Sequence, residues 1–210
     1  MPLSFFQGQV VKEFNSPFSG KIQLIKHLGS YKIVAGDLLQ SGSIVKNLWQ
    51  KPLKKVKSKN EKVKSILLLG LGGGTIIPLL TKKWPQAQIT AIEIDQIMIK
   101  LARQYFGLNR YSQVKPIEAD AFTFVKNLKE QYDLVIVDLF CGNSISATLY
   151  SPKFIRDLKK VIKSTGFLLI NHLFFGEYQI AAEKLITTTD KEFETVNLIR
   201  NLSNIFLLCS

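Results

Sequence analysis

Short apolar runs alternate with amphipathic stretches from Ser65 to the end of the chain. The runs are rich in isoleucine, leucine and valine, which predicts buried strands. They lie at Ile66–Leu69, Gln88–Ile92, Val114–Glu118, Leu134–Asp138 and Gly166–Asn171. The stretches between them have helical spacing of apolar residues, at Thr75–Lys83, Gln96–Phe106, Ala121–Glu130 and Ser151–Lys163. This alternation predicts right-handed crossovers and a doubly wound parallel sheet.

The C-terminal part completes the pattern. A last helix is predicted at Glu177–Thr188, and two further strands follow at Thr195–Arg200 and Asn204–Cys209. These two strands are close enough in sequence to pair as a hairpin. We therefore expect a seven-stranded, Rossmann-like α/β fold of the class I methyltransferase type.

The first 58 residues follow a different pattern. Two short alternating strands, Lys21–Ile25 and Tyr31–Ala35, meet at Gly29-Ser30, and Gly36-Asp37 indicates another turn. This region is too short to form a core of its own, so it should pack on the main domain or on a second subunit. We predict a small N-terminal β-hairpin region at 1–58 and a Rossmann-like domain at 59–210.

Charge and composition narrow the choice of partners. The net charge is +12, but only four of the 28 basic residues are arginine, and the lysines are scattered. This favours solvated helix faces over a nucleic-acid surface, although a nucleic-acid partner stays open. The densest cluster, Lys51–Lys64, is interpreted as a solvated linker. The chain shows no membrane-spanning run, no signal-peptide pattern and no disulfide framework, so we expect a cytoplasmic protein.

A glycine turn and a following acid predict a nucleoside site. Gly70, Gly72 and Gly74 follow the first buried strand, and Glu93 ends the second. Glycines let the backbone approach a ligand closely, and a carboxylate at this position accepts hydrogen bonds from ribose hydroxyls. The alternatives are a turn used only for packing and a solvated acid at a strand end.

The third and fourth strands also end in acids. Asp120 is placed to accept the adenine amino group, and the Ala121 amide to donate to a ring nitrogen; capping of a helix by Asp120 is the alternative. Asp95 precedes the helix predicted at Gln96–Phe106 and is expected to cap it. Asp138 ends the fourth strand, where it faces a substrate as a proton acceptor or holds loop amides as a structural carboxylate.

Two more residues have reactive side chains at this edge of the sheet. Cys141 lacks a neighbouring histidine, so we interpret it as a packing residue rather than a nucleophile. His172 follows the fifth strand and is interpreted as an ordinary strand-end histidine rather than a base. No metal site is predicted.

Together these motifs resemble the spermidine synthase family, which comprises the polyamine aminopropyltransferases and their methyltransferase-like relatives. The resemblance rests on Lys21-Ile22, Gly36-Asp37, Gln40, Ala91–Asp95, Ala119–Ala121, Tyr132–Asp138 and Leu149–Phe154. It implies that Glu93 binds the ribose, that Asp120 and Ala121 bind the adenine, and that Asp138 is the catalytic proton acceptor. It also implies a homodimer formed through the N-terminal β region.

The chain departs from this family where the aminopropyl group of decarboxylated S-adenosylmethionine and the diamine would bind. Gly72 stands where the family has an acid in the glycine loop, and the diamine-gripping loop reads Asp138-Leu139-Phe140-Cys141 without its second acid. The family's tyrosine–histidine/glutamine–glutamate element corresponds to Trp49-Gln50-Lys51. Because a diammonium substrate needs nearby carboxylates, these losses disfavour aminopropyl transfer. The missing glycine-loop acid also relieves repulsion against the carboxylate of S-adenosylmethionine, which favours the intact form over the decarboxylated one.

The leading hypothesis is therefore an S-adenosylmethionine-dependent methyltransferase with a small, partly hydrophobic acceptor. The cofactor would be held by Gly70, Gly72, Gly74, Glu93, Asp120 and Ala121. The acceptor would meet Asp138, with Trp49, Gln50, Leu139 and Cys141 around it. One alternative is an aminopropyltransferase that uses decarboxylated S-adenosylmethionine. A second is a non-catalytic module that binds nucleic acid through Lys51–Lys64.

Overall fold

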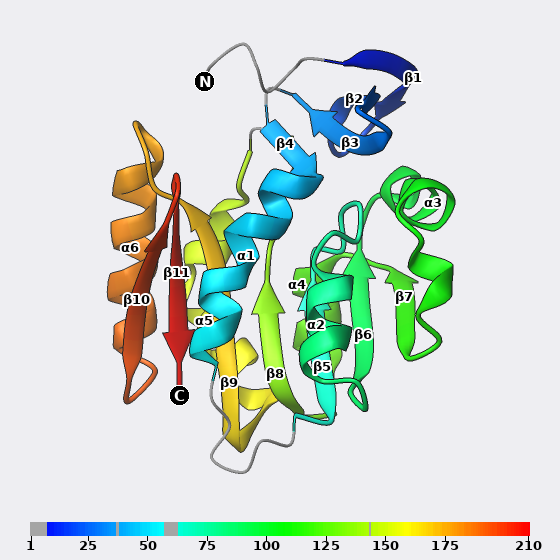
Figure 1. The fold of residues 1–210 in the computed structure, drawn as a ribbon. Helices are drawn as coiled ribbons and strands as arrows, with labels where there is room; N and C mark the ends of the chain where they lie inside the picture. The colour runs from blue at the N-terminus through cyan, green and yellow to red at the C-terminus, as the bar shows by residue number, and fades with distance from the viewer. Residues whose placement is uncertain (1–7, 37, 57–62, 143) are drawn as a thin grey trace.

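The computed structural model describes residues 8–36, 38–56, 63–142 and 144–210. Within them, the predicted strands assemble into a seven-stranded sheet in the order β10-β11-β9-β8-β5-β6-β7 (Figure 1). The strands are β5 (Ser65–Leu69), β6 (Gln88–Glu93), β7 (Val114–Glu118), β8 (Tyr132–Val137), β9 (Ile162–Leu173), β10 (Val196–Asn201) and β11 (Asn204–Cys209). β5 to β9 pair in parallel, and β11 runs antiparallel to both β9 and β10. The predicted Rossmann-like fold is confirmed.

Helices cover both faces of this sheet. They are α2 (Ile77–Lys83), α3 (Gln96–Tyr105), α4 (Ala121–Asn127), α5 (Pro152–Lys160) and α6 (Tyr178–Asp190), with short 3₁₀ turns at Leu108–Arg110 and Ala147–Tyr150. Alternate residues of the central strand β5 enter opposite cores: Leu68 packs on the side of α2 and α3, and Leu69 on the side of α4, α5 and α6. A strand buried on both faces explains why its sequence is wholly apolar.

A second, antiparallel sheet lies above the carboxyl ends of the parallel strands (Figure 1). Its strands are β1 (Gln9–Ser16), β2 (Gly20–His27), β3 (Ser30–Ala35) and β4 (Leu38–Ser41). It packs on α3 through a small core that joins Ile22, Leu24 and Ile33 to Met98 and Leu101.

The sheet comprises more than the predicted hairpin. The hairpin of β2 and β3 is confirmed, whereas β1 and β4 were not predicted. The second residue of the predicted turn, Asp37, and the predicted boundary between residues 58 and 59 lie outside the described residues.

Helix α1 (Ser43–Lys55) was also not predicted from the sequence. It lies along the main sheet (Figure 1), where the Trp49 ring meets Phe206 edge to face with 5.0 Å between ring centroids. Pro52 lies inside this helix and cannot donate to the Leu48 carbonyl, which instead accepts from Asn201 Nδ2 at 2.8 Å. Residues 51–55 are therefore helical, and the linker interpretation is wrong for them. Among the described helices, none combines the length and the apolar surface that a membrane crossing requires.

Candidate active site

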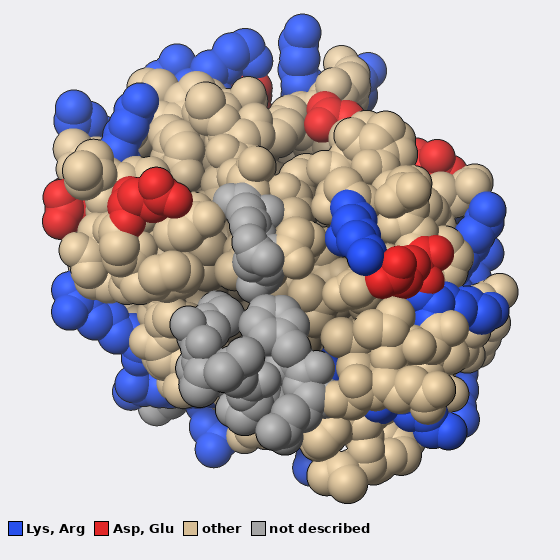
Figure 2. Space-filling model, turned by 90° about the horizontal axis from the view of Figure 1, so that it is seen from above, with Lys and Arg blue, Asp and Glu red and all other residues tan. Residues whose placement is uncertain are grey.

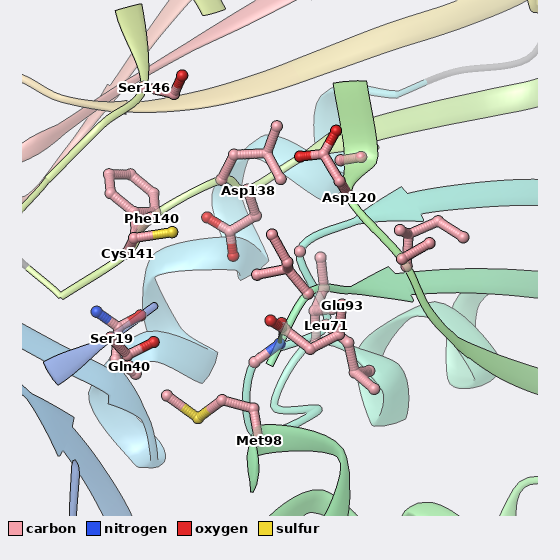
Figure 3. Close-up of a pocket in the computed structure, with 18 of the residues that line it drawn as sticks. Ser19, Gln40, Leu71, Glu93, Met98, Asp120, Asp138, Phe140, Cys141 and Ser146 are labelled. Atoms are coloured by element: carbon pink, nitrogen blue, oxygen red, sulfur yellow. Dashed lines mark hydrogen bonds between the residues drawn. The ribbon is translucent and has the colours of Figure 1, made fainter. Parts of the chain in front are cut away.

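A narrow cavity of about 90 Å³ lies where β5, β6 and β8 end and α4 begins (Figure 3). It brings together most of the predicted site residues: Trp49, Gly70, Gly72, Glu93, Asp120, Ala121, Asp138, Leu139 and Cys141. These residues come from five separate segments of the chain. Their convergence follows from the parallel sheet, because the carboxyl ends of parallel strands meet at one edge.

Glu93 is the last residue of β6 and is 9% exposed. Its Oε2 accepts from the Gly72 amide at 2.7 Å, and its Oε1 accepts from the Asp95 amide at 3.0 Å. Burial raises the pKa of this carboxyl, and the two amide hydrogen bonds oppose the rise. Each oxygen keeps a lone pair beyond the amide that it binds, so the carboxylate is fixed at the cavity with acceptor capacity to spare.

The glycine turn is held tightly at Gly70. Its amide donates to the Ile92 carbonyl at 2.9 Å, and its φ of +92° is one that favours glycine. A Cβ at this position would lie 2.1 Å from the Asp138 carbonyl oxygen. Gly72 is open by comparison, since a Cβ there would meet only the Gln40 carbonyl oxygen at 3.8 Å.

Gly74 does not line the cavity, contrary to its predicted role. Its amide donates to the Leu71 carbonyl at 2.9 Å, which closes the turn ahead of α2. A Cβ at Gly74 would face Ala102 at 3.6 Å, on the packing side of the turn. Spacing alone predicted three equivalent glycines, and the structure separates the two at the cavity from the one that packs.

Of the two roles that the sequence left open for Asp120, the helix cap is confirmed, and adenine binding stays a prediction. Asp120 caps α4, where its Oδ1 accepts from the Thr123 amide at 2.8 Å, and it also lines the cavity. Ala121 follows as the first residue of the helix and is buried. Asp95 caps α3 as predicted and also accepts from Ser16 Oγ at 2.6 Å, which ties β1 to the main domain.

Asp138 follows β8 and borders two cavities. Its Oδ1 accepts from Asn171 Nδ2 at 2.8 Å. Burial raises its pKa to about 6, helped by the charge of Glu93 and opposed by Asn171 and Trp49. Among the described residues it receives no backbone amide, so the alternative of a carboxylate that holds loop amides finds no support there.

The second cavity has a volume of about 430 Å³ and lies between α1, β4, the end of β9 and the start of β11. Its apolar lining consists of Leu38, Leu39, Ile44, Val45, Leu48, Trp49, Phe140, Leu173, Phe175 and Leu202. Its polar lining consists of Gln40, Asp138, Asn171, Ser203 and Asn204. Within the described part of the chain, Asp138 is the one charged residue on this surface. Sequence reasoning missed most of these residues. Six of the missed residues lie in α1 and β4, which were not predicted, and the others come from separate segments that only the folded sheet brings together.

Trp49 reaches both cavities, but the two residues that follow it do not. Gln50 is exposed and donates to Asn47 Oδ1 at 3.3 Å, so the structure does not bring this predicted substrate contact to the site. Lys51 donates to the Arg200 carbonyl at 2.8 Å on the protein surface. Consecutive residues of a helix point about 100° apart, so only one residue of this triplet faces the sheet. The lysine therefore does not repel a diamine inside the cavity.

The two remaining candidates differ in position. Cys141 lines the first cavity, and burial raises the pKa of its thiol. His172 is fully buried and lines neither cavity, as expected of an ordinary strand-end histidine. Its Nε2 lies 2.9 Å from the Tyr150 hydroxyl, and its Nδ1 lies 2.6 Å from the Leu173 carbonyl oxygen. Figure 3 shows further lining residues that were not predicted as site residues, among them Ser19, Gln40, Leu71, Met98, Phe140 and Ser146.

The sequence profile described as spermine/spermidine synthase domain matches residues 51–203. The chain belongs to this family. The match includes β5, β6, β8 and the loops that follow them at the first cavity, and residues before 51, from the N-terminal sheet and the first part of α1, complete its lining.

Relatives of two kinds match the chain. A polyamine aminopropyltransferase from Vibrio vulnificus is 31% identical over 115 residues, which are 53% of this chain and 38% of that protein. An eEF1A lysine and N-terminal methyltransferase homolog from Drosophila melanogaster is 31% identical over 122 residues, 54% of this chain and 18% of that protein. The chain therefore spans less than half the length of either relative. Both relatives are named as transferases, of different groups.

Solved structures show the same fold. Spermidine synthase from Thermotoga maritima superposes with a TM-score of 0.77 at 15% identity, over 96% of this chain and 72% of that chain. Human methyltransferase-like protein 13, solved in complex with SAH, gives a TM-score of 0.65 at 20% identity, over 81% of this chain and 82% of that one.

Proposed function

We propose that the protein is an S-adenosylmethionine-dependent methyltransferase of the spermidine synthase-like group, with a small molecule as acceptor. The composition of the second cavity carries this proposal. Its described lining is mostly apolar and has Asp138 as the one carboxylate. A diammonium substrate would leave one cation buried without a partner, which is unfavourable by several kcal/mol.

The residues of the first cavity suit an adenosine-bearing cofactor. Glu93 has spare acceptor capacity for ribose hydroxyls, and Asp120 is oriented at the rim by its capping bond to Thr123. Gly70 and Gly72 present backbone without side chains at the cavity. The structural neighbour methyltransferase-like protein 13 was solved with SAH, which supports the same class of ligand here. The cofactor would supply a methyl group on a cationic sulfur.

The remaining chemistry would fall to the chain itself. Asp138 borders both cavities. The charge of Glu93 raises its pKa, and its carboxylate accepts a hydrogen bond from Asn171. With a pKa of about 6 it is mostly charged at neutral pH, so it can take a proton from an acceptor group. The apolar wall around it would exclude water and orient the acceptor, and positioning of this kind lowers the barrier to transfer.

Aminopropyl transfer is the second candidate, and the family match favours it. The aminopropyltransferase from Vibrio vulnificus is as similar in sequence as the methyltransferase homolog. This candidate needs further carboxylates around the acceptor. It would use decarboxylated S-adenosylmethionine and act on a diamine.

The nucleic-acid alternative gains no support from the face above the carboxyl ends of the strands. On the face seen from above, lysine and arginine side chains are spread around the edge, with acidic side chains among them (Figure 2). A nucleic-acid surface would gather them into a stripe or patch.

Two titrations and one transfer assay test the proposal. Calorimetry would measure binding of S-adenosylmethionine and of its decarboxylated form to the wild type and to Glu93→Ala. Radiolabelled methyl and aminopropyl groups would then report transfer to a mixture of small molecules. We expect the intact form to bind more tightly, the variant to lose that binding, and methyl label alone to be transferred. Binding of the decarboxylated form only, or aminopropyl transfer to putrescine, would refute the proposal.

We further propose a homodimer formed through the N-terminal β region and a cytoplasmic location. Val10, Val11 and Phe18 are between 40% and 44% exposed on or just after β1, which supports an apolar contact there. Light scattering of the wild type and of Val11→Lys would test the dimer. A monomeric wild type would refute it.

A further inference from the structure

The indole N–H of Trp49 is buried but makes no hydrogen bond within the described residues. The side chain has no solvent exposure and borders both cavities. It lies beside Asp138, where it favours the charged form of the carboxylate without completing a hydrogen bond. Buried polar groups of this kind are rare in folded proteins, and a ligand that accepts from the N–H would complete it.

One oxygen of the Asp138 carboxylate is already satisfied. Ser203 Oγ donates to Asn204 Oδ1 at 3.4 Å, and Asn204 Nδ2 donates to Asn171 Oδ1 at 2.9 Å. Asn171 Nδ2 then donates to Asp138 Oδ1 at 2.8 Å. Each residue in this series donates to the next, and the series ends at Asp138 Oδ1, which is therefore occupied. In the described part of the protein, Oδ2 accepts no hydrogen bond.

The charge of the second cavity restricts the acceptor. Apart from Asp138, its described lining holds no acid, lysine or arginine. A dication would find one partner only, and an anion would face Asp138 without a cation to offset it. An uncharged, largely apolar molecule matches this surface, and a cavity of about 430 Å³ is within the range of small-molecule sites.

We infer that the acceptor is an uncharged, mostly apolar molecule whose nucleophile is a hydroxyl group held between Trp49 and Asp138; this rests on the proposed methyl transfer. A hydroxyl group donates one hydrogen to Oδ2 and has two lone pairs. One lone pair accepts from the Trp49 N–H, and the other stays free to attack. A neutral amine has a single lone pair, which the indole would occupy, and an ammonium has none.

The step balances with S-adenosylmethionine as the second substrate. A bond forms between the hydroxyl oxygen and the methyl carbon, while the bond from that carbon to sulfur breaks and its electron pair stays on sulfur. The hydroxyl proton passes to Asp138 Oδ2 and then to water. The products are a methyl ether and a neutral thioether. In this arrangement Trp49 and Asp138 touch the substrate, whereas Asn171 and Asn204 are positioning residues.

The test uses matched compounds on two apolar scaffolds, naphthalene and biphenyl. Each scaffold is offered as the hydrocarbon, the hydroxyl compound, the neutral aromatic amine and the carboxylate, and putrescine is the dication. Calorimetry measures binding to the full-length protein loaded with S-adenosylhomocysteine, and tritium from labelled S-adenosylmethionine reports transfer. We expect the hydroxyl compound to bind about tenfold more tightly than the hydrocarbon or the amine, and to be methylated.

Trp49→Phe keeps a ring against Phe206 and removes the N–H, so the advantage of the hydroxyl compound should fall about tenfold. Trp84→Phe is the matched control, because Trp84 is buried in the same core but lines neither cavity. The inference is overturned if the amine, the carboxylate or putrescine is preferred, or if the hydroxyl compound has no advantage on either scaffold. An unchanged preference in Trp49→Phe also overturns it.

Cofactor binding separates this inference from the proposed function. Binding of S-adenosylmethionine that depends on Glu93, without a hydroxyl preference, overturns only the acceptor class. Loss of both refutes the methyltransferase itself. If Trp49→Phe does not fold, the comparison of compounds on the wild type decides alone.

Discussion

The side-chain amide of Asn171 donates to the Asp138 carboxylate, with 2.8 Å between Nδ2 and Oδ1. The two residues extend neighbouring parallel strands, since Val137 pairs with Ile170 in the register of β8 and β9. Sheet pairing therefore sets this contact. The contact opposes the effect of burial, which raises the pKa of Asp138 to about 6. Asn171 thus helps to keep the proposed proton acceptor charged at neutral pH.

Replacing Asn171 by leucine should shift the pH dependence of transfer. Without its hydrogen bond, the pKa of Asp138 rises above about 6, and the acidic limb of kcat/KM should move to higher pH by about one unit. Profiles of wild type and variant measured with the same acceptor would show the shift. Asn127→Leu, on the exposed face of α4, should leave the limb unchanged. An unshifted limb in Asn171→Leu would contradict the assigned role.

Asp138 should also lower the stability of the free protein at neutral pH. Its pKa rises from 3.8 to about 6 on folding, so the folded state holds the proton more tightly than the unfolded chain. Stability is therefore highest below both values and is lost as the pH rises through about 6. A shift of about two units corresponds to about 3 kcal/mol. Asp138→Asn should raise the free energy of unfolding by up to that amount at pH 8, change it little at pH 4, and abolish transfer.

Urea unfolding at the two pH values would measure this effect. Asp133→Asn is a control of opposite sign. Burial raises the pKa of Asp133, but hydrogen bonds from Lys163, Lys64 and Ser65 outweigh it and lower the pKa below its usual value. Its charge therefore stabilises the fold at neutral pH, and the variant should be less stable there. A difference in unfolding free energy between Asp138→Asn and the wild type that is the same at pH 4 and pH 8 would show that burial does not strain the charge.

The sequence predicted the acids of the site because each one ends a strand. Glu93, Asp120 and Asp138 follow apolar runs, and in a parallel sheet such ends converge without any knowledge of side-chain packing. The positions of those runs were predicted from the pattern of apolar residues alone. The convergence of strand ends therefore also predicted where the first cavity lies.

The second cavity could not be predicted in this way. Part of its wall comes from α1, which contains Pro52, and a proline usually indicates that a helix does not continue. Another part comes from β4, a short strand at the edge of its sheet. Asn171 and Asn204 meet only because β11 pairs with β9, a contact between residues 33 positions apart. Gln50 was misplaced because adjacency in sequence does not give a shared helix face. To predict this cavity, one would need to know that β9 pairs with β11 and which face of α1 meets the sheet.

Glu93 offers a direct test of nucleoside binding. Glu93→Gln removes the charge at the cavity and should weaken S-adenosylhomocysteine binding at least about tenfold, which is about 1.4 kcal/mol. Calorimetry at constant pH would measure the loss. Glu118→Gln is a matched control, because Glu118 pairs with Glu93 in the register of β6 and β7 yet is exposed and lines neither cavity. Equal losses in the two variants would exclude a specific role for Glu93.

Gly70 should tolerate no side chain. In Gly70→Ala, the new Cβ would lie 2.1 Å from the Asp138 carbonyl oxygen, so the backbone that carries Asp138 must move. We expect a loss of more than about 3 kcal/mol of unfolding free energy, or failure to fold, since a positive φ alone accounts for about 1–2 kcal/mol. Gly29→Ala isolates that part, because Gly29 has a φ of +75° and nothing within 4 Å of a Cβ. Similar losses in the two variants would mean that the contact with Asp138 is unimportant.

Cys141 can report occupancy of the first cavity without a transfer assay. Burial raises the pKa of its thiol, with help from the charges of Glu93, Asp95 and Asp120, so alkylation by iodoacetamide should be slow at pH 7.5 and faster at higher pH. S-adenosylhomocysteine should slow it at least about tenfold in the wild type but not in Glu93→Gln. Cys209 is fully buried and its pKa is raised to about 12, so it should stay unlabelled until the protein unfolds. Mass spectrometry would follow both sites.

Cys141→Ser should keep nucleoside binding and transfer within about twofold, since a packing role needs no thiolate. Complete loss of transfer with intact binding would instead make the thiol a reacting group.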